Sequence, residues 1–176
     1  PNLPPVIPYS RYIQWLEARD SGESKRFWQD YLSGYGRAVV IPETSFLRKD
    51  AEDRHEETSF EIEADMVASL QGLAAHHNVT LNTVVQSVLA VLLSRYNNVP
   101  DVVFGAVVSG RTHEVAGIER MVGNFINTIP VRIKPRADMT VQDLLQEAQK
   151  DALACEPYLY YPLNRILSLS SLKQGL

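Results

Sequence analysis

The chain has 176 residues, of which 45% are hydrophobic and 22% charged, and its formal net charge is −4. This mild acidity, without a cluster of Lys and Arg, argues against a nucleic acid or an anionic membrane surface as a partner. The single cysteine, Cys155, excludes an internal disulfide and a cysteine-based zinc site, and no apolar run reaches the length of a membrane span. We therefore expect a protein of the reducing cytoplasm.

The N-terminal third is predicted to hold a linker and two helices. Residues 1–8 contain four prolines and should form an extended linker or crossover segment. The chain does not begin with Met, so we expect it to be part of a longer protein. A helix beginning at Tyr9 places aromatic residues on one face, and a second helix from Glu23 to Ser33 ends before Gly34.

The middle of the chain is predicted to contain a loop, a strand and two helices. Residues 35–57 lack helical periodicity and read as a surface loop, with at most a short strand at 38–41. Polar and apolar residues alternate over 58–63, which predicts a half-buried strand. A helix from Asp65 to His77 follows. Thr80 then caps a helix whose apolar residues should all be core: Leu81, Val84, Val85, Val88, Leu89, Leu92, Leu93 and Tyr96.

The most informative stretch runs from residue 101 to residue 133. Its first part, 102–108, is apolar throughout and predicts a strand buried on both faces, ending at Ser109-Gly110-Arg111. Its second part, 122–133, interleaves apolar residues with Asn124, Asn127, Thr128 and Arg132. Polar side chains in a buried strand must find hydrogen-bond partners, so these residues are candidates for structural or functional roles.

The C-terminal part is predicted to be helical. Thr140 and Asp143 have the spacing of a capping box and should begin a helix that ends before Pro157. A short helix is expected from Leu163 to Leu169.

Several kinds of catalytic or metal site are not supported by the sequence. The four histidines (His55, His76, His77, His113) lack the spacing of a metal site. Ser109 lacks the Gly-x-Ser-x-Gly turn of an esterase nucleophile, and Gly105 and Gly110 do not form a phosphate-binding loop. We therefore predict no metal and no directly bound cofactor.

Three motifs resemble those of the condensation domains of nonribosomal peptide synthetases. The segment from Val122 through Thr128, followed by Arg132, resembles the core motif Gly-x-Phe-Val-Asn-Thr-x-x-x-Arg. The stretch from Phe104 to Arg111 resembles the strand and loop before that motif. Tyr9, Tyr12 and Trp15 resemble the motif Tyr-x-Asp-Phe-x-x-Trp, although Arg11 stands where the family has Asp.

The resemblance implies an α/β fold with a mixed sheet flanked by helices. Residues 1–176 would form a partial C-terminal lobe of a chloramphenicol-acetyltransferase-like condensation domain. Two such lobes enclose a tunnel in which an acceptor amine attacks a donor thioester. Both substrates would arrive on phosphopantetheine arms of peptidyl carrier proteins. The implied partners are these carriers, the N-terminal lobe and an adjacent adenylation domain.

The family's catalytic motif, His-His-x-x-x-Asp-Gly, is not matched in this sequence. At His76-His77, the positions for Asp and Gly hold Leu81 and Asn82, so a helix-end role is favoured for the two histidines. We assign no catalytic residue and expect the chain alone to be inactive. We also expect it to have exposed apolar surface or an unpaired strand edge, either of which invites self-association. Near Pro162 the match to the next core motif is good only at Tyr161-Pro162, whereas Tyr158 and Tyr160 depart from it.

Under this resemblance, the candidates for the substrate tunnel or the lobe interface are Ser109, Gly110, Arg111, Asn124, Asn127, Thr128 and Arg132. For Ser109-Gly110-Arg111 the alternative is a turn with Arg111 paired to Glu114 or Glu119. For Asn127 and Thr128 the alternative is structural hydrogen bonding. The other functions we consider are a non-catalytic docking module of the same fold and a small CoA-dependent acyltransferase. The missing His-x-x-x-Asp pattern disfavours the acyltransferase, and the residues after Phe125 disfavour an epimerisation domain.

Overall fold

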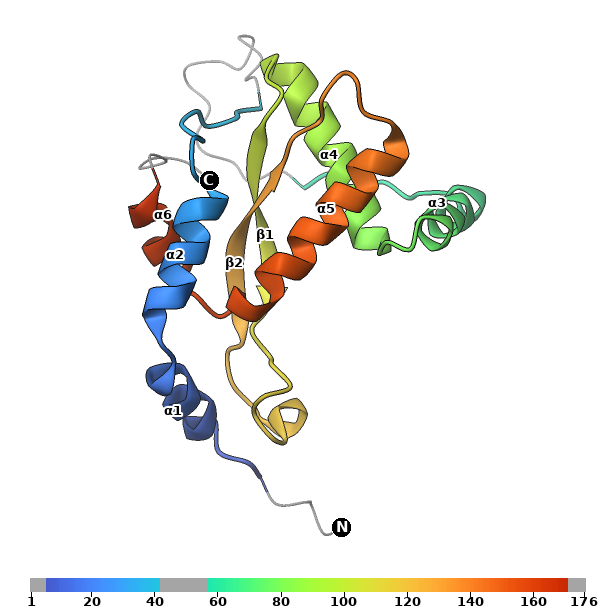
Figure 1. Cartoon of the computed structure of the whole chain (residues 1–176). Helices are drawn as coiled ribbons and strands as arrows, with labels where there is room; N and C mark the ends of the chain where they lie inside the picture. Colours follow the sequence, from blue (N-terminus) through green and yellow to red (C-terminus); the bar gives the residue numbers. More distant parts are fainter. Residues whose placement is uncertain (1–5, 42–56, 171–176) are drawn as a thin grey trace, which may run out of the picture. The chain divides into compact units, whose positions relative to one another are not determined.

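The computed structural model describes residues 6–41 and 57–170, which form helices and a two-stranded sheet (Figure 1). The helices are α1 (Ser10–Ala18), α2 (Ser21–Tyr31), α3 (Ala64–His76), α4 (Leu81–Asn97), α5 (Val141–Cys155) and α6 (Leu163–Leu169), and the strands are β1 (Val102–Ser109) and β2 (Ile126–Ile133). Short 3₁₀ turns lie at Ile118–Arg120 and Glu156–Tyr158. The predicted helices and the α/β class are thus confirmed.

The chain divides into two compact units. Unit 1 comprises residues 1–38, 103–132 and 154–176, and unit 2 comprises residues 39–102 and 133–153. Unit 1 therefore contains most of the sheet with α1, α2 and α6, and unit 2 contains α3, α4 and most of α5.

The two strands of the sheet run antiparallel. The Gly110 N–H donates to the Phe125 carbonyl at 2.6 Å, and Gly105 lies opposite Thr128, so residue numbers increase along β1 as they decrease along β2. The predicted burial of both faces of β1 is wrong. Val102 and Val103 are buried, but from Phe104 onward half-buried and exposed residues alternate, and Val107 is 73% exposed. One face of this part of the sheet is therefore open.

The core of unit 1 lies where α2 and α6 pack together, and the two helices are side by side in Figure 1. Trp28 of α2 and Ile166 of α6 are completely buried. The rest of this cluster consists of Leu32, Tyr35, Val103, Ile129, Cys155 and Tyr161. The Tyr35 hydroxyl accepts a hydrogen bond from the Val103 N–H at 3.1 Å, which ties the start of β1 to the residues after α2.

Unit 2 is built on the pairing of α3 with α4. The predicted cap is confirmed, because the Thr80 hydroxyl accepts from the Thr83 N–H at 3.0 Å. The Gln149 side-chain oxygen of α5 accepts from the Thr80 N–H and from the Thr83 hydroxyl, so this helix start is also fixed from α5. The core of the unit is Ala74, Val84 and Leu145.

The prediction that every apolar residue of α4 is core is wrong. The buried face of α4 is narrower and is made largely of small or polar residues: Thr83, Val84, Ser87, Ala90 and Leu93. A neighbouring stripe is exposed by 38% to 61% and consists of Val85, Val88, Leu89, Leu92 and Tyr96. The expected exposed apolar surface is thus confirmed in the part of the chain that the structure describes.

Two segments in the middle of the chain for which the sequence allows a strand, residues 58–63 and 38–41, form no strand. The strand expected at 58–63 is wrong, since this segment belongs to no sheet and Phe60 and Ile62 are 82% and 53% exposed. Residues 38–41 form no strand either, although Val40 forms backbone hydrogen bonds with the Asn97 side chain. The predictions for residues 1–5, the 42–56 part of the loop including His55, and 171–176 lie outside the described residues.

Within the described residues, no single helix is long and apolar enough to cross a membrane. The pair α3 and α4 satisfies length and composition together, but the chain bends by 102° between them.

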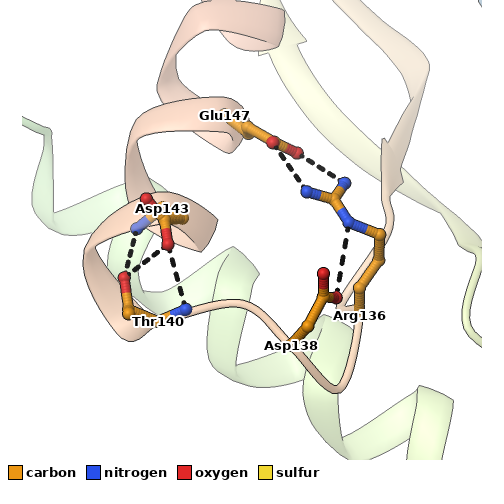
Figure 2. Close-up of polar contacts among 5 residues, drawn as sticks. All are labelled: Arg136, Asp138, Thr140, Asp143 and Glu147. Atoms are coloured by element: carbon orange, nitrogen blue, oxygen red, sulfur yellow. Dashed lines mark hydrogen bonds and ion pairs between the residues drawn. The ribbon is translucent and has the colours of Figure 1, made fainter.

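The predicted capping box at the start of α5 is confirmed and is shown in Figure 2. The Thr140 hydroxyl accepts from the Asp143 N–H at 3.2 Å, and the Asp143 carboxylate accepts from the Thr140 N–H at 3.1 Å. The preceding loop is held by Arg136, whose guanidinium forms two hydrogen bonds with the Glu147 carboxylate at 3.1 and 3.2 Å. The hydrogen bonds from Thr140 hold the pKa of the Asp143 carboxyl below its usual range.

This lowered pKa predicts an acid-sensitive start of α5. Because the folded-state pKa of Asp143 lies below the unfolded-state value, its stabilising contribution is present at neutral pH and is lost as pH falls through the folded-state pKa. We expect Asp143→Asn to reduce stability at pH 7 and to remove part of the acid dependence measured by urea unfolding between pH 7 and pH 2. An unchanged acid profile would contradict this role. The control variant is Asp65→Asn, which removes one negative charge from the first turn of another helix, α3.

The exposed stripe of α4 predicts self-association of the isolated chain. Apolar side chains on adjacent turns favour burial against a second molecule. We expect the molar mass measured by light scattering to rise with protein concentration, and Leu92→Lys to shift the chain towards the monomer. Gln146→Lys, on an exposed position of α5, should leave the mass unchanged. A monomer at all concentrations would refute the expectation.

Candidate functional site

The loop between the strands is organised around Arg111. Its guanidinium donates to the backbone carbonyls of Ile118 and Met121, the latter at 3.1 Å, and lies 4.0 Å from the centre of the Phe125 ring. The predicted pairing of Arg111 with a carboxylate is wrong. Glu114 pairs with Arg19, and Glu119 is 3.6 Å from Arg120. Three backbone and ring contacts satisfy Arg111 instead, which gives the loop a defined path.

Aromatic residues of α1 and the residue before it pack against the end of this loop. The Phe125 ring meets Tyr9 edge-on at 5.1 Å and Tyr12 at 4.8 Å, and the Tyr9 hydroxyl donates to the Asn124 carbonyl. Gly110 leaves room for this packing, since a Cβ there would lie 2.8 Å from the Tyr12 hydroxyl and 3.1 Å from the Phe125 carbonyl oxygen, so that a larger residue would force one of them to shift. The segment that resembles Tyr-x-Asp-Phe-x-x-Trp therefore packs against the segment that resembles Gly-x-Phe-Val-Asn-Thr-x-x-x-Arg and supports it.

Arg132 is buried and ties β2 to the end of α2. Its guanidinium donates to the carbonyls of Tyr31 and Ser33 at 2.8 Å each, and its backbone N–H donates to the Tyr31 hydroxyl at 2.8 Å. The guanidinium carbon lies over the Tyr35 ring, 5.5 Å from its centre. A positive charge at the C-terminal end of a helix is favoured by the helix dipole and by the free carbonyls there. The geometry gives Arg132 a structural role.

Removing this guanidinium should destabilise the chain strongly. Arg132→Ala deletes, among its contacts, the charged hydrogen bonds to the Tyr31 and Ser33 carbonyls and leaves both carbonyls without that donor, so we expect a loss of about 2–4 kcal/mol in the free energy of unfolding. Urea titration followed by circular dichroism measures it. Arg37→Ala, at an exposed position of the same unit, should change stability by less than about 0.5 kcal/mol. Similar losses in both variants would contradict the structural role.

The structure separates Asn127 from the other polar candidates on the strands. The Asn127 amide points to the inner side of β2 and donates to the carbonyls of Leu159 at 2.7 Å and Tyr161 at 2.8 Å. Thr128 lies on the opposite face, against Gly105, and Ser109 and the exposed Val107 share that open face by strand alternation. Asn124 caps the start of β2 by accepting from the Ile126 N–H at 3.0 Å.

Unit 1 also contains a hollow that the sequence did not indicate. It is a half-open pocket of about 430 Å³, lined by Ile13, Leu16, Glu17, Arg19, Ser21, Tyr160, Tyr161, Pro162 and Arg165. The Arg19 guanidinium packs against the rings of Trp15 at 4.5 Å and Tyr160 at 5.2 Å. Its Nε has no hydrogen-bond partner among the described residues. Arg19 and Tyr160 lie at opposite ends of the sequence, so no local pattern could reveal their contact.

Other candidate chemistry is not assembled in the described residues. The rings of His76 and His77 pack edge-on at 4.8 Å at the C-terminal end of α3, with no carboxylate hydrogen-bonded to either among the described residues. Nor does the described part of the chain contain a group of three or more His, Cys, Asp or Glu side chains placed to hold a metal ion.

Comparison with known proteins establishes the family. The family model described as Condensation domain matches residues 1–175, so the chain belongs to the condensation-domain family. It is 46% identical over 169 residues to bacitracin synthase 3 of Bacillus licheniformis and 40% identical over 177 residues to tyrocidine synthase 2 of Brevibacillus parabrevis. These alignments cover 96% and 99% of the chain but only 3% and 5% of the two synthases.

Solved structures confirm the fold. SgcC5 from Streptomyces globisporus aligns over 96% of this chain and 38% of its own, with 18% identity and a TM-score of 0.75. The X-domain from teicoplanin biosynthesis aligns over 94% of this chain and 37% of its own, with 24% identity and a TM-score of 0.69. The α/β fold expected from the sequence motifs is thus the fold that the chain adopts.

Proposed function

We propose that this chain is the partial C-terminal lobe of a nonribosomal peptide synthetase condensation domain. The acceptor amine would attack the carbonyl carbon of the donor acyl or peptidyl thioester and form a C–N bond. The C–S bond would then break, the thiol of the donor's phosphopantetheine would leave, and the amine proton would end on that thiol. The match of the family model to almost the whole chain carries this proposal, and the names of the relatives, synthases of bacitracin and tyrocidine, support it.

We infer that the open face of the sheet lines the substrate tunnel or forms part of the interface with the other lobe. Ser109 and Thr128 present hydroxyls on this face, and Val107 and Ile126 are each 73% exposed there. A face that combines apolar side chains with two hydroxyls suits a thioester-bound acyl chain or a second lobe. Arg111, Gly110 and Asn124 contribute indirectly, by fixing the loop that leads into β2.

We infer that the hollow beside Tyr160 contacts a carrier protein. Aromatic and apolar side chains line it together with two arginines and one carboxylate, Glu17. Arg165 is exposed and lines the hollow, so its guanidinium can reach an acidic partner. The further partners in the proposal are the N-terminal lobe, which would bring the family's His motif, and an adjacent adenylation domain.

The experiment uses purified protein and phosphopantetheine-loaded carriers. A longer protein that contains this chain and the N-terminal lobe should form amide between a donor thioester and an acceptor aminoacyl thioester, measured by mass spectrometry of the carrier-bound product. The 176-residue chain alone should form none, because the family's His-His-x-x-x-Asp-Gly motif is not in its sequence. Turnover by the chain alone that is abolished by His77→Ala would overturn our assignment of His77 to a helix end.

A second candidate function is a docking module without catalysis. One solved relative of the fold is the X-domain of teicoplanin biosynthesis, whose structure is also known as a complex with OxyB. Under this alternative the longer protein would bind carriers but form no amide with any loaded donor and acceptor pair, so the same assay decides between the two functions.

A further inference from the structure

The side chain of Asn127 makes contacts that β2 itself does not require. A side-chain amide carries two N–H donors, and Asn127 Nδ2 makes two contacts, to the Leu159 and Tyr161 carbonyls. These two carbonyls flank Tyr160 in the chain. The segment around them follows a 3₁₀ turn whose backbone bonds are local, such as the one from the Tyr161 N–H to the Tyr158 carbonyl at 3.0 Å. Asn127 therefore supplies this segment with a long-range anchor.

Tyr160 is held from its side chain as well. Its hydroxyl shares a 2.7 Å hydrogen bond with the completely buried Ser24 hydroxyl of α2. Its ring meets Trp15 edge-on at 5.3 Å and packs against the Arg19 guanidinium. The backbone on both sides of Tyr160 and the Tyr160 ring are thus fixed at the edge of the hollow. Such preorganisation lowers the entropy cost of binding a partner.

The same segment sets the direction of α6. The Pro162 carbonyl accepts from the Arg165 and Ile166 N–H groups at 3.0 and 3.1 Å, and the Ile166 side chain is completely buried. Arg165, on the first turn of α6, lines the hollow. A shift of the carbonyls at 159 and 161 would therefore displace both Tyr160 and Arg165.

We propose that Asn127 is a positioning residue that holds Tyr160 and the start of α6 in place around the hollow, and thereby sets the affinity of the chain for a carrier protein. The carrier as ligand rests on the proposed function, whereas the hold on Tyr160 does not. Asn127 touches no substrate under this proposal.

Two measurements on the same variants test the proposal. The first is native-state hydrogen exchange of residues 158–166, which needs no ligand. Asn127→Ala and Asn127→Asp should each speed exchange of the Tyr161 and Ile166 amides more than about tenfold, because the carboxylate of Asp cannot donate to the two carbonyls. The second is the Kd of a phosphopantetheine-bearing carrier protein for the longer protein, measured by fluorescence anisotropy, which should rise about tenfold, the effect of losing a well-placed contact.

Two further variants separate positioning from a loss of stability alone. Leu145→Ala lowers stability at the buried core of unit 2 and should change neither the exchange of 158–166 nor the Kd. Tyr160→Ala should raise the Kd about as much as Asn127→Ala, and the double variant should be no worse than either, because both changes remove the same contact surface.

The outcomes are distinct. If Asn127→Ala leaves the exchange of residues 158–166 unchanged, or if its effect on Kd adds fully to that of Tyr160→Ala, the proposal is overturned. If exchange accelerates locally but the wild-type protein binds no carrier, the hold on Tyr160 stands, and both the affinity claim and the assignment of the hollow to a carrier fall. Amide formation with unchanged carrier affinity in Asn127→Ala would refute the affinity claim alone.

Discussion

The structure of unit 1 depends on the satisfaction of polar groups along β2. Arg132 places a buried positive charge against the carbonyls that end α2, and Asn127 gives both of its N–H donors to the segment before α6. Arg132 is buried and Asn127 half-buried, and withdrawing such polar groups from water without partners is costly, so each residue constrains the segment that satisfies it. Through Arg132 and Asn127, β2 fixes the end of α2 and the segment before α6, which lie far from it in the sequence.

The second organising feature is the way α1 and the loop between the strands support one another. The Arg111 guanidinium donates hydrogen bonds to carbonyls of the loop and packs over the face of the Phe125 ring. Tyr9 and Tyr12 complete that cluster, and Gly110 leaves the room that Tyr12 occupies. The open face of the sheet therefore lies beside a loop whose path is fixed by these contacts.

Exposure of apolar residues has a different meaning in the two units. On β1 and β2 the exposed residues share their face with the hydroxyls of Ser109 and Thr128, so that face combines apolar contact with hydrogen bonding. The exposed stripe of α4 consists of aliphatic side chains with a single tyrosine, Tyr96. Such a stripe is typical of a packing interface, and it explains why helical periodicity alone assigned it to the core.

The sequence by itself determined the helices to within a few residues, the two caps, a strand at residues 102–108 and strand character within 122–133, and the family. These follow from local chemistry: periodicity, the hydroxyls of Thr80 and Thr140, and a motif written in consecutive residues. Only the tertiary structure decided that Arg111 binds carbonyls and not carboxylates, that Asn127 faces inward while Thr128 faces the open side, and that 58–63 is not a strand. It also decided which apolar face of α4 is covered. The reason is that partners far apart in sequence, such as Asn127 with Tyr161 and Arg19 with Tyr160, are chosen by packing, and no local pattern records that choice.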